Sequence, residues 1–259
     1  MKIQFTFIPN KTTTLILITI FLLSAALDAG ADIGTKAILQ DIDELANFEN
    51  TDFSGIYTIV SERPGEERSV TEARLFRRDK TDQFLLLILK PEVDRGQGYL
   101  QIDENVWFYD PNSREFERTS IRENVEDSDA QNADFNRNSF ANDYQVTSWT
   151  DGKLGGQGVY IMNLQATTTD VAYERLKIWV LKKPHIILKQ EEYSVSERLM
   201  RTTYFYKYAK AGDKYTPSQV LIVDELNKGE RTQLTVRNIT TRKIPNRVFT
   251  KDYLELVNK

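Results

Sequence analysis

Few residues of this sequence could carry out acid–base or nucleophilic chemistry. The chain contains one histidine, His185, and no cysteine. A serine-based triad needs an imidazole to take up the proton of the nucleophile, but His185 lies in KKPHIIL, where we expect a strand start and a structural or surface residue instead of a base. The G-x-S-x-G and H-E-x-x-H motifs are absent, and no pair of carboxylates stands out for glycoside hydrolysis. We therefore expect no catalytic residues and no enzymatic activity.

Two further stretches look like ion-binding or phosphate-binding sites at first sight. Asp127-x-Asp129 begins like a calcium loop, but its sixth position is Asn132 instead of Gly and its twelfth is Asn138 instead of Glu. We interpret this acidic segment as a solvated loop. The glycine-rich stretch GGQG at 155–158 precedes an expected strand, which favours a hairpin turn or a bulge. We expect neither a metal ion nor a cofactor.

The stretch NVWFYDPNSREFER at 105–118 is apolar on both faces of an expected strand. Neighbouring side chains of a strand point to opposite faces, so Trp107 and Tyr109 point one way and Phe108 points the other. Unbroken apolar runs also occur at 84–89 (FLLLIL), 178–181 (IWVL) and 220–223 (VLIV). A sheet that packs on one side alternates apolar and polar residues. These strands therefore require cover on both faces.

The helical segments that could supply this cover are short. We expect a helix over 35–48 with Ile38, Ile42 and Leu45 on one stripe, a polar loop with one or two helical turns over 122–143, and a closing helix over 250–256 with Thr250 as N-cap. About a dozen short strands between them indicate an antiparallel sheet.

Because so little helix is available, the sheet must also cover itself by curling. We predict a mainly β (α+β) fold, in which a strongly curved antiparallel sheet forms a half-open barrel. Helices form a lid over its apolar cavity. A solid core without any ligand is the alternative that the pattern leaves open.

The first 31 residues have the features of a secretory signal. Lys2 and Lys11 precede the apolar run 15–27, and Ala29-Gly30-Ala31 forms a small-residue cleavage site. We expect cleavage after Ala31 and a single domain over 32–259 in the periplasm, with an uncleaved inner-membrane anchor as the alternative. Without cysteine, no disulfide can assist the core.

The net charge argues against one class of partner. The 259 residues carry a formal net charge of −4, and no stripe of Arg and Lys is interleaved with aromatic residues. Binding of nucleic acid calls for a basic face. We therefore expect no nucleic-acid partner.

Several motifs occur here in a characteristic order. They comprise a Gly-Tyr strand, an aromatic hairpin that contains proline, and a basic residue on the returning strand: Gly98, Tyr99, Trp107, Tyr109, Pro111 and Arg118. Together with IPNRVFTKDYLEL at 244–256, they resemble the outer-membrane lipoprotein-sorting protein family, which includes the periplasmic lipoprotein carrier LolA and its larger relatives. The likeness spans roughly residues 54–256. One departure is QNADFNRNSF at 131–140, where larger relatives carry a stretch similar to Phe-Met-Gly-Ser-Asp-Phe.

The resemblance implies a carrier that takes acyl chains of lipoproteins, or phospholipid, into its cavity without covalent chemistry. Burial of acyl chains would supply about 0.8 kcal/mol per CH₂, and release would need a better acceptor, such as a membrane receptor. We expect the cavity to be lined by Leu85, Leu87, Trp107, Tyr109, Phe135, Phe140 and Trp179, and the lid to present Ile38, Ile42 and Leu45. The alternatives are an accessory protein of an envelope exporter and, third, a lipid-cleaving enzyme.

Overall fold

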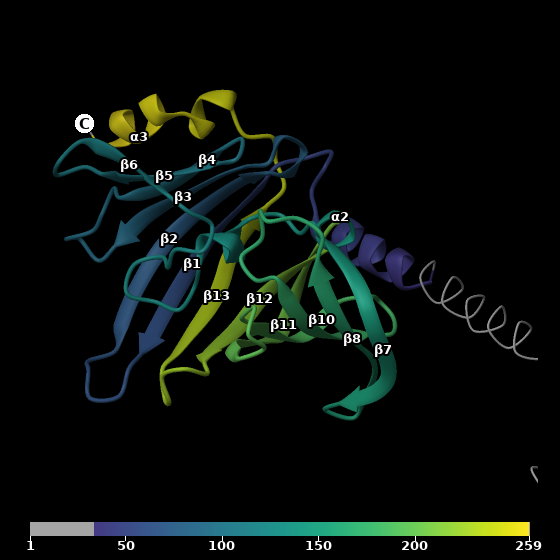
Figure 1. Ribbon diagram of the computed structural model, residues 1–259. Coiled ribbons are helices and arrows are strands. Elements are labelled where there is room, and N and C mark those ends of the chain that lie inside the picture. Colours follow the sequence, from purple (N-terminus) through teal and green to yellow (C-terminus); the bar gives the residue numbers. More distant parts are fainter. Residues whose placement is uncertain (1–33, 259) are drawn as a thin grey trace, which may run out of the picture.

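One antiparallel sheet of 13 strands forms the fold in the computed structural model, which describes residues 34–258 (Figure 1). The strands are β1 (Phe53–Glu62), β2 (Ser69–Arg78), β3 (Gln83–Lys90), β4 (Gly98–Ile102), β5 (Asn105–Asp110), β6 (Glu115–Thr119), β7 (Tyr144–Leu154), β8 (Gln157–Ala166), β9 (Arg175–Leu181), β10 (Ile187–Tyr193), β11 (Leu199–Ala211), β12 (Lys214–Asp224) and β13 (Arg231–Thr240). Their order is β6-β5-β4-β3-β2-β1-β13-β12-β11-β10-β9-β8-β7. Within residues 34–258 the edge strands β6 and β7 do not pair with each other, so the predicted half-open barrel is confirmed.

The sheet consists of two meanders, β1–β6 and β7–β13, which are joined where β1 pairs with β13. Residues 120–143 run from one edge of the sheet to the other and cross in front of its middle (Figure 1). This connection contains η2 (Asn132–Phe135) and α2 (Phe140–Asp143). The predicted loop with one or two helical turns is confirmed, and its path over the sheet makes it part of the cover.

Helices lie at both ends of the described chain. Residues 34–46 are helical, and Leu39 and Ile42 are buried against β8 to β10. The short helices η1 (Asp79–Thr81) and η3 (Asn246–Phe249) precede β3 and α3 (Lys251–Val257), respectively. The amide of Tyr253 donates to Thr250 Oγ1 at 3.3 Å, which confirms the predicted N-cap of the closing helix. Strand β6, with the largely polar and exposed sequence EFERT, is the returning strand of the aromatic hairpin and carries Arg118.

The C-terminal helices cover the outer face of β3 to β5. Leu85, Leu100 and Tyr109 are buried there together with Phe249 and Leu254. A Cβ atom on Gly98 would lie 2.6 Å from Leu254 Cδ2, so only glycine allows the helix to approach this closely. The second face of the NVWFYD strand is therefore covered by the chain's own C-terminus.

The connection between the edges fills the inner face of β1 to β5. Phe135 of η2, at 0% exposure, contacts Tyr57 edge-on with ring centroids 5.4 Å apart. Val125 and Ala130 of the same connection are buried in this cluster with Phe84 and Leu86 of β3. This half of the barrel consequently has a solid core.

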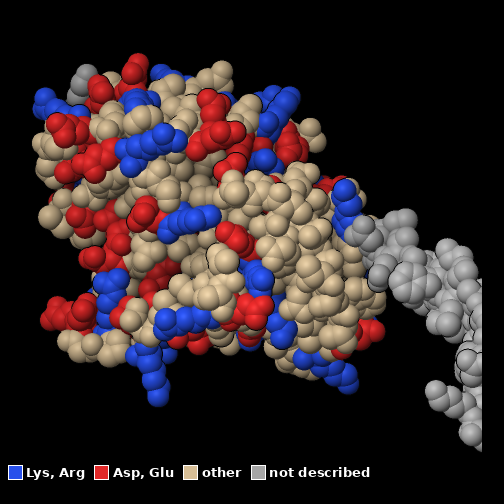
Figure 2. All heavy atoms as spheres, viewed as in Figure 1, with Lys and Arg blue, Asp and Glu red and all other residues tan. Residues whose placement is uncertain are grey.

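The predicted signal segment 1–31 lies outside the described residues. Within residues 34–258, none of the helices has the length and the hydropathy that a membrane crossing requires. On the face shown in Figure 2, acidic and basic side chains are interspersed, and uncharged residues gather over β7 and β8. No single sign of charge dominates this view of the surface.

Candidate functional site

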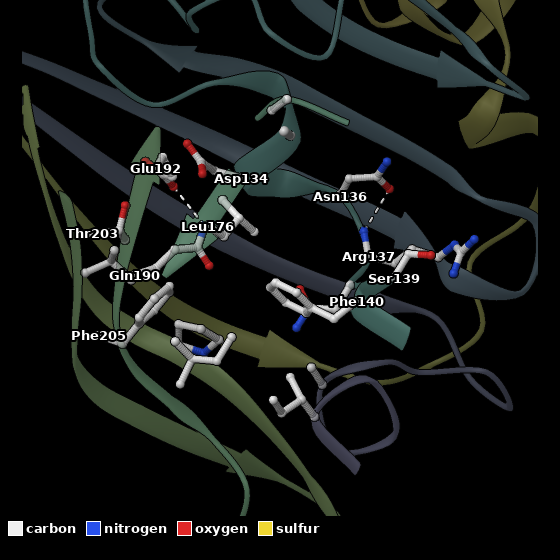
Figure 3. A pocket seen from close by; sticks show the side chains of 18 of the residues that line it. Asp134, Asn136, Arg137, Ser139, Phe140, Leu176, Gln190, Glu192, Thr203 and Phe205 are labelled. Atoms are coloured by element: carbon white, nitrogen blue, oxygen red, sulfur yellow. Dashed lines mark hydrogen bonds between the residues drawn. The ribbon is translucent and has the colours of Figure 1, made fainter. Parts of the chain in front are cut away.

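A cavity of about 260 Å³ lies in the other half of the barrel, between the sheet and the segments that cross it (Figure 3). Its wall is the inner face of β9 to β13 and β1. Its cover consists of the helix 34–46 and the connection 120–143, and we use "cover" for these two segments together. The volume is close to the lower end of the range of about 300–1,000 Å³ for small-molecule sites.

Most of the wall is apolar. Phe205 of β11, Val220 and Ile222 of β12, and Leu234 and Val236 of β13 line the cavity. Strand alternation explains this lining, because Val220 and Ile222 point inward while Leu221 between them points outward. The unbroken run VLIV therefore supplies both the wall of the cavity and part of the outer face.

A buried ion cluster links the cover to the wall. Arg201 of β11 makes paired hydrogen bonds to Asp134 of η2, at 2.8 and 2.9 Å, and to Glu192 of β10, at 2.5 and 2.9 Å. Burial acts to lower the pKa of Arg201, but the carboxylates of Asp134 and Glu192 outweigh it and raise that pKa well above its usual value. The guanidinium is therefore held charged between two carboxylates at one end of the cavity.

Buried hydrogen bonds hold the two segments of the cover together. Asp43 of the helix accepts hydrogen bonds from the amides of Phe140 and Ala141 at 2.9 and 2.8 Å. Asn47 and Asn138 exchange two hydrogen bonds, at 2.7 and 3.0 Å. The helix and the connection therefore form one unit.

The cover also contacts the rest of the barrel. Arg77 of β2 donates to the carbonyls of Asn136, at 3.0 Å, and Ala46, at 3.2 Å. At the rim of the cavity, His185 Nδ1 lies 2.7 Å from Asp41 Oδ2, and Lys214 Nζ donates to the carbonyl of Glu44 at 2.8 Å. His185 therefore contacts the cover helix, in agreement with the structural role expected for it.

Three of the ten residues expected at the cavity line it. Phe140, Ile42 and Leu45 all come from the cover. Ile38, from the same helical stripe, packs beside the buried cluster formed by Leu39, Ile42 and β8 to β10. The side of the helix that faces the cavity therefore includes Ile42 and Leu45, and Ile38 lies beside it.

The other six residues do not line the cavity, which corrects the prediction. Leu85, Leu87, Trp107 and Tyr109 lie on the outer face, next to the C-terminal helices, and Lys251 Nζ lies 3.1 Å from the ring centre of Trp107. Trp179 also points outward, beneath Lys177 and Lys189 at 5.1 and 4.4 Å. Phe135 points inward but packs in the solid half. When both alternating sets of side chains in a strand are apolar, the sequence does not show which set points into the barrel.

The acidic and glycine-rich stretches have local structural explanations. Asp129, Asp224 and Glu230 bring carboxylate oxygens within 4.8 Å of one another. Asp129 accepts from Thr232 at 2.9 Å, Asp224 accepts from amides of the following turn, and Glu230 pairs with Arg63, so we assign no metal to them. Gly155 and Gly156, with φ of 55° and 82°, form the turn between β7 and β8, which confirms the predicted hairpin.

Two half-buried carboxylates should make stability depend on pH. Burial raises the pKa of Asp43 to about 6 and that of Glu126, which accepts from the Tyr99 hydroxyl, to about 7. At pH values between the usual and the raised pKa, that is from 3.8 to about 6 for Asp43 and from 4.5 to about 7 for Glu126, the folded chain binds more protons than the unfolded chain. We expect the free energy of unfolding to increase by on the order of 1–2 kcal/mol from pH 8 to pH 5, measured by urea denaturation.

The control for this prediction uses neutral isosteres. Combining Asp43→Asn with Glu126→Gln should reduce the dependence and leave the part that comes from Asp129, Asp143 and Glu192, whose pKa values burial also raises, whereas Asp213→Asn at an exposed site should leave it unchanged. The pKa of Asp52 is lowered, so this residue changes the free energy of unfolding only below about pH 3.8, outside the measured range. A free energy of unfolding that falls between pH 8 and pH 5 would contradict the assignment.

Comparison with known proteins gives the following relatives. A family model described as "Uncharacterized protein" matches residues 80–256, and a search of curated proteins finds no match. A LolA superfamily protein from Nitrosomonas europaea is 24% identical, with a TM-score of 0.73 over 84% of this chain and 97% of that one. A domain from Vibrio parahaemolyticus, described as an outer membrane lipoprotein-sorting protein, is 20% identical, with a TM-score of 0.75 over 85% and 97%.

A third solved structure is equally similar in fold. A DUF1329 family protein from Desulfovibrio piger is 18% identical, with a TM-score of 0.76 over 86% of this chain and 98% of that one. At these identities the likeness establishes the fold. The resemblance inferred from the sequence motifs is thereby confirmed at the level of the fold.

Proposed function

We propose a function from one premise: this chain belongs to the family whose model matches residues 80–256, and it has the fold of the LolA superfamily. In this proposal it is a non-enzymatic periplasmic carrier. It binds acyl chains of lipoproteins or other lipids in its cavity and hands them toward the outer membrane. The observation that supports the proposal most directly is the cavity with a largely apolar wall, beneath a cover whose two segments are hydrogen-bonded to each other.

The chemistry of the wall favours hydrocarbon as the guest. Phe205, Val220 and Val236 present apolar surface to the cavity, and Phe140 presents it from the cover. Each CH₂ group that leaves water for such a surface contributes about 0.8 kcal/mol. A few methylene groups are therefore enough to hold a chain without a covalent bond.

Loading and release require the cover to separate from the wall. The internal bonds of the cover, from Asp43 to α2 and between Asn47 and Asn138, can persist while it moves. The contacts that must break include those of His185 and Lys214 at the rim, Arg201 at the ion cluster, and Arg77 on β2. A membrane receptor that competes for the guest or the cover would then set the direction of transfer.

A cross-link across the rim tests whether the cover moves. The chain has no native cysteine, so Asp41→Cys with His185→Cys can be joined selectively by a short, reducible bismaleimide. We expect exchange of a bound fluorescent acylglycerol to slow by about 100-fold or more in the cross-linked protein, because the cover can no longer leave the wall, and to recover on reduction. Stopped-flow fluorescence measures the exchange.

The matched control places a cross-link within the wall. Lys189→Cys with Tyr204→Cys joins paired positions on the outer faces of β10 and β11, and it should leave exchange unchanged. Equal exchange with and without the Asp41–His185 cross-link would overturn the moving cover. A protein that binds no acyl probe at all would instead favour the accessory role, and release of free fatty acid from added phospholipid would favour the enzyme.

A further inference from the structure

Polar side chains gather at one end of the cavity wall. Gln190 of β10 and Thr203 of β11 are cross-strand partners that both line the cavity, close to Glu192 (Figure 3). Glu192 pairs with Arg201 of β11. Thr203 is 3% exposed, and its hydroxyl oxygen has no hydrogen-bond partner among the described residues. A buried hydroxyl without a partner is costly. A guest that supplies one would therefore be favoured at this end.

A second such hydroxyl lines the cavity at the far end of the β11–β12 hairpin. Thr216 is 6% exposed, and its oxygen likewise has no partner within residues 34–258. Thr216 pairs with Ala209, six residues along β11 from Thr203. The wall between the two threonines is apolar, with Phe205, Val220 and Ile222. The cavity thus combines a hydrocarbon surface with isolated uncharged donors.

The cationic side chains that line the cavity are already neutralised. Each arginine pairs with a carboxylate, as in Arg77–Asp79 at 2.6 Å, Arg137–Asp82 at 3.2 Å and Arg201 with both Asp134 and Glu192. His185 faces Asp41. The cluster around Arg201 holds two carboxylates for one guanidinium, so its formal charge is −1. A carboxylate or phosphate at this end would meet excess negative charge and no free cation.

We propose, on the basis of the carrier function, that the cavity selects guests whose buried polar group is uncharged, such as an ester or amide carbonyl, and rejects free carboxylates. The Thr203 hydroxyl donates to that carbonyl, and Gln190 beside it, which donates one N–H to Glu192 at 2.8 Å, has a second N–H to offer. An acyl ester loses little hydration on entry and satisfies a buried donor. A fatty-acid anion would lose its hydration without gaining a counter-ion.

Two ligands that have the same hydrocarbon chain but different polar groups test this selectivity. Binding of 1-monolaurin and of laurate is measured by calorimetry at about pH 8.5, where the acid is ionised. We expect the wild-type chain to bind monolaurin at least about tenfold more tightly than laurate. Thr203→Val should weaken monolaurin about fivefold by removing the donor. The exposed Thr235→Val on β13 is the matched control and should have no effect.

A charge variant provides an independent measurement. Glu192→Gln removes the excess negative charge beside Thr203, so the affinity for laurate relative to that for monolaurin should rise about tenfold over the wild type. The selectivity would be overturned if laurate bound as tightly as monolaurin, or if the Thr203→Val protein bound monolaurin like the wild type. Either result would leave the proposed carrier function intact. Absence of binding for both ligands would overturn the carrier function and this inference with it.

Discussion

Val220→Trp should reduce binding of an acyl probe by about 100-fold or more while the protein remains folded. Val220 of β12 is the cross-strand partner of Phe205 on β11 and of Leu234 on β13, and it points into the cavity. An indole at this position occupies the space that a hydrocarbon chain would take. Because the ring enters existing space and displaces few packed atoms, we expect the melting temperature to change by only a few degrees. Fluorescence titration and thermal denaturation measure the two effects.

The neighbouring residue offers a matched control for this substitution. Leu221 is next to Val220 and points to the outer face of the same strand, opposite Tyr204. Leu221→Trp therefore adds the same ring at the same height of the sheet without entering the cavity, and it should bind the probe like the wild type. Unchanged affinity in a folded Val220→Trp protein would show that the guest lies elsewhere.

Arg201→Leu should lower the free energy of unfolding by about 3–5 kcal/mol, because it leaves Glu192 buried without its counter-ion. That is a large part of the roughly 5–15 kcal/mol that stabilises a typical domain. Loss of the bonds to Asp134 and to the carbonyl of Asp129 also detaches η2 from the wall. Urea denaturation followed by circular dichroism measures the change.

An exposed ion pair provides the comparison for Arg201. Arg175 pairs with Glu197 on the surface, where both side chains are largely in water. Arg175→Leu should therefore cost less than about 1 kcal/mol. Adding Glu192→Leu to Arg201→Leu should recover part of the lost stability, since the unpaired charge is then gone. A loss below about 1 kcal/mol for Arg201→Leu alone would contradict the structural role of the cluster.

Much of the fold could be predicted because it depends on local patterns. Turn residues and the alternation of apolar and polar residues predicted the strands. The apolar stripe that contains Ile42 predicted the helix of the cover. The inward face of a strand such as FLLLIL could not be predicted, because Leu85 and Leu86 are equally apolar. Which face of β3 points inward depends on segments that are distant in the sequence, because η2 packs on one face and α3 packs on the other.

The polar end of the cavity was missed for a related reason. Glu192 and Arg201 are nine residues apart on adjacent strands, and Asp134 is 67 residues from Arg201. Their meeting depends on register and on the path of the connection across the sheet, neither of which local periodicity encodes. The available signal is that Gln190 and Glu192 occupy the same phase of β10, whereas Ile187 reaches that face only through the register shift between Ile187 and Lys189. Polar residues at buried positions of a strand indicate a site or a satisfied cluster.

The most direct test of the account is to locate the guest. A monoacylglycerol with a diazirine near the end of its chain is bound to the wild-type protein and photolysed, and mass spectrometry identifies the labelled residues. The account predicts about one label per chain, on cavity residues such as Phe140, Phe205 and Ile222. Labelling confined to outer-face residues such as Trp179 and Tyr204, or none at all, would contradict it.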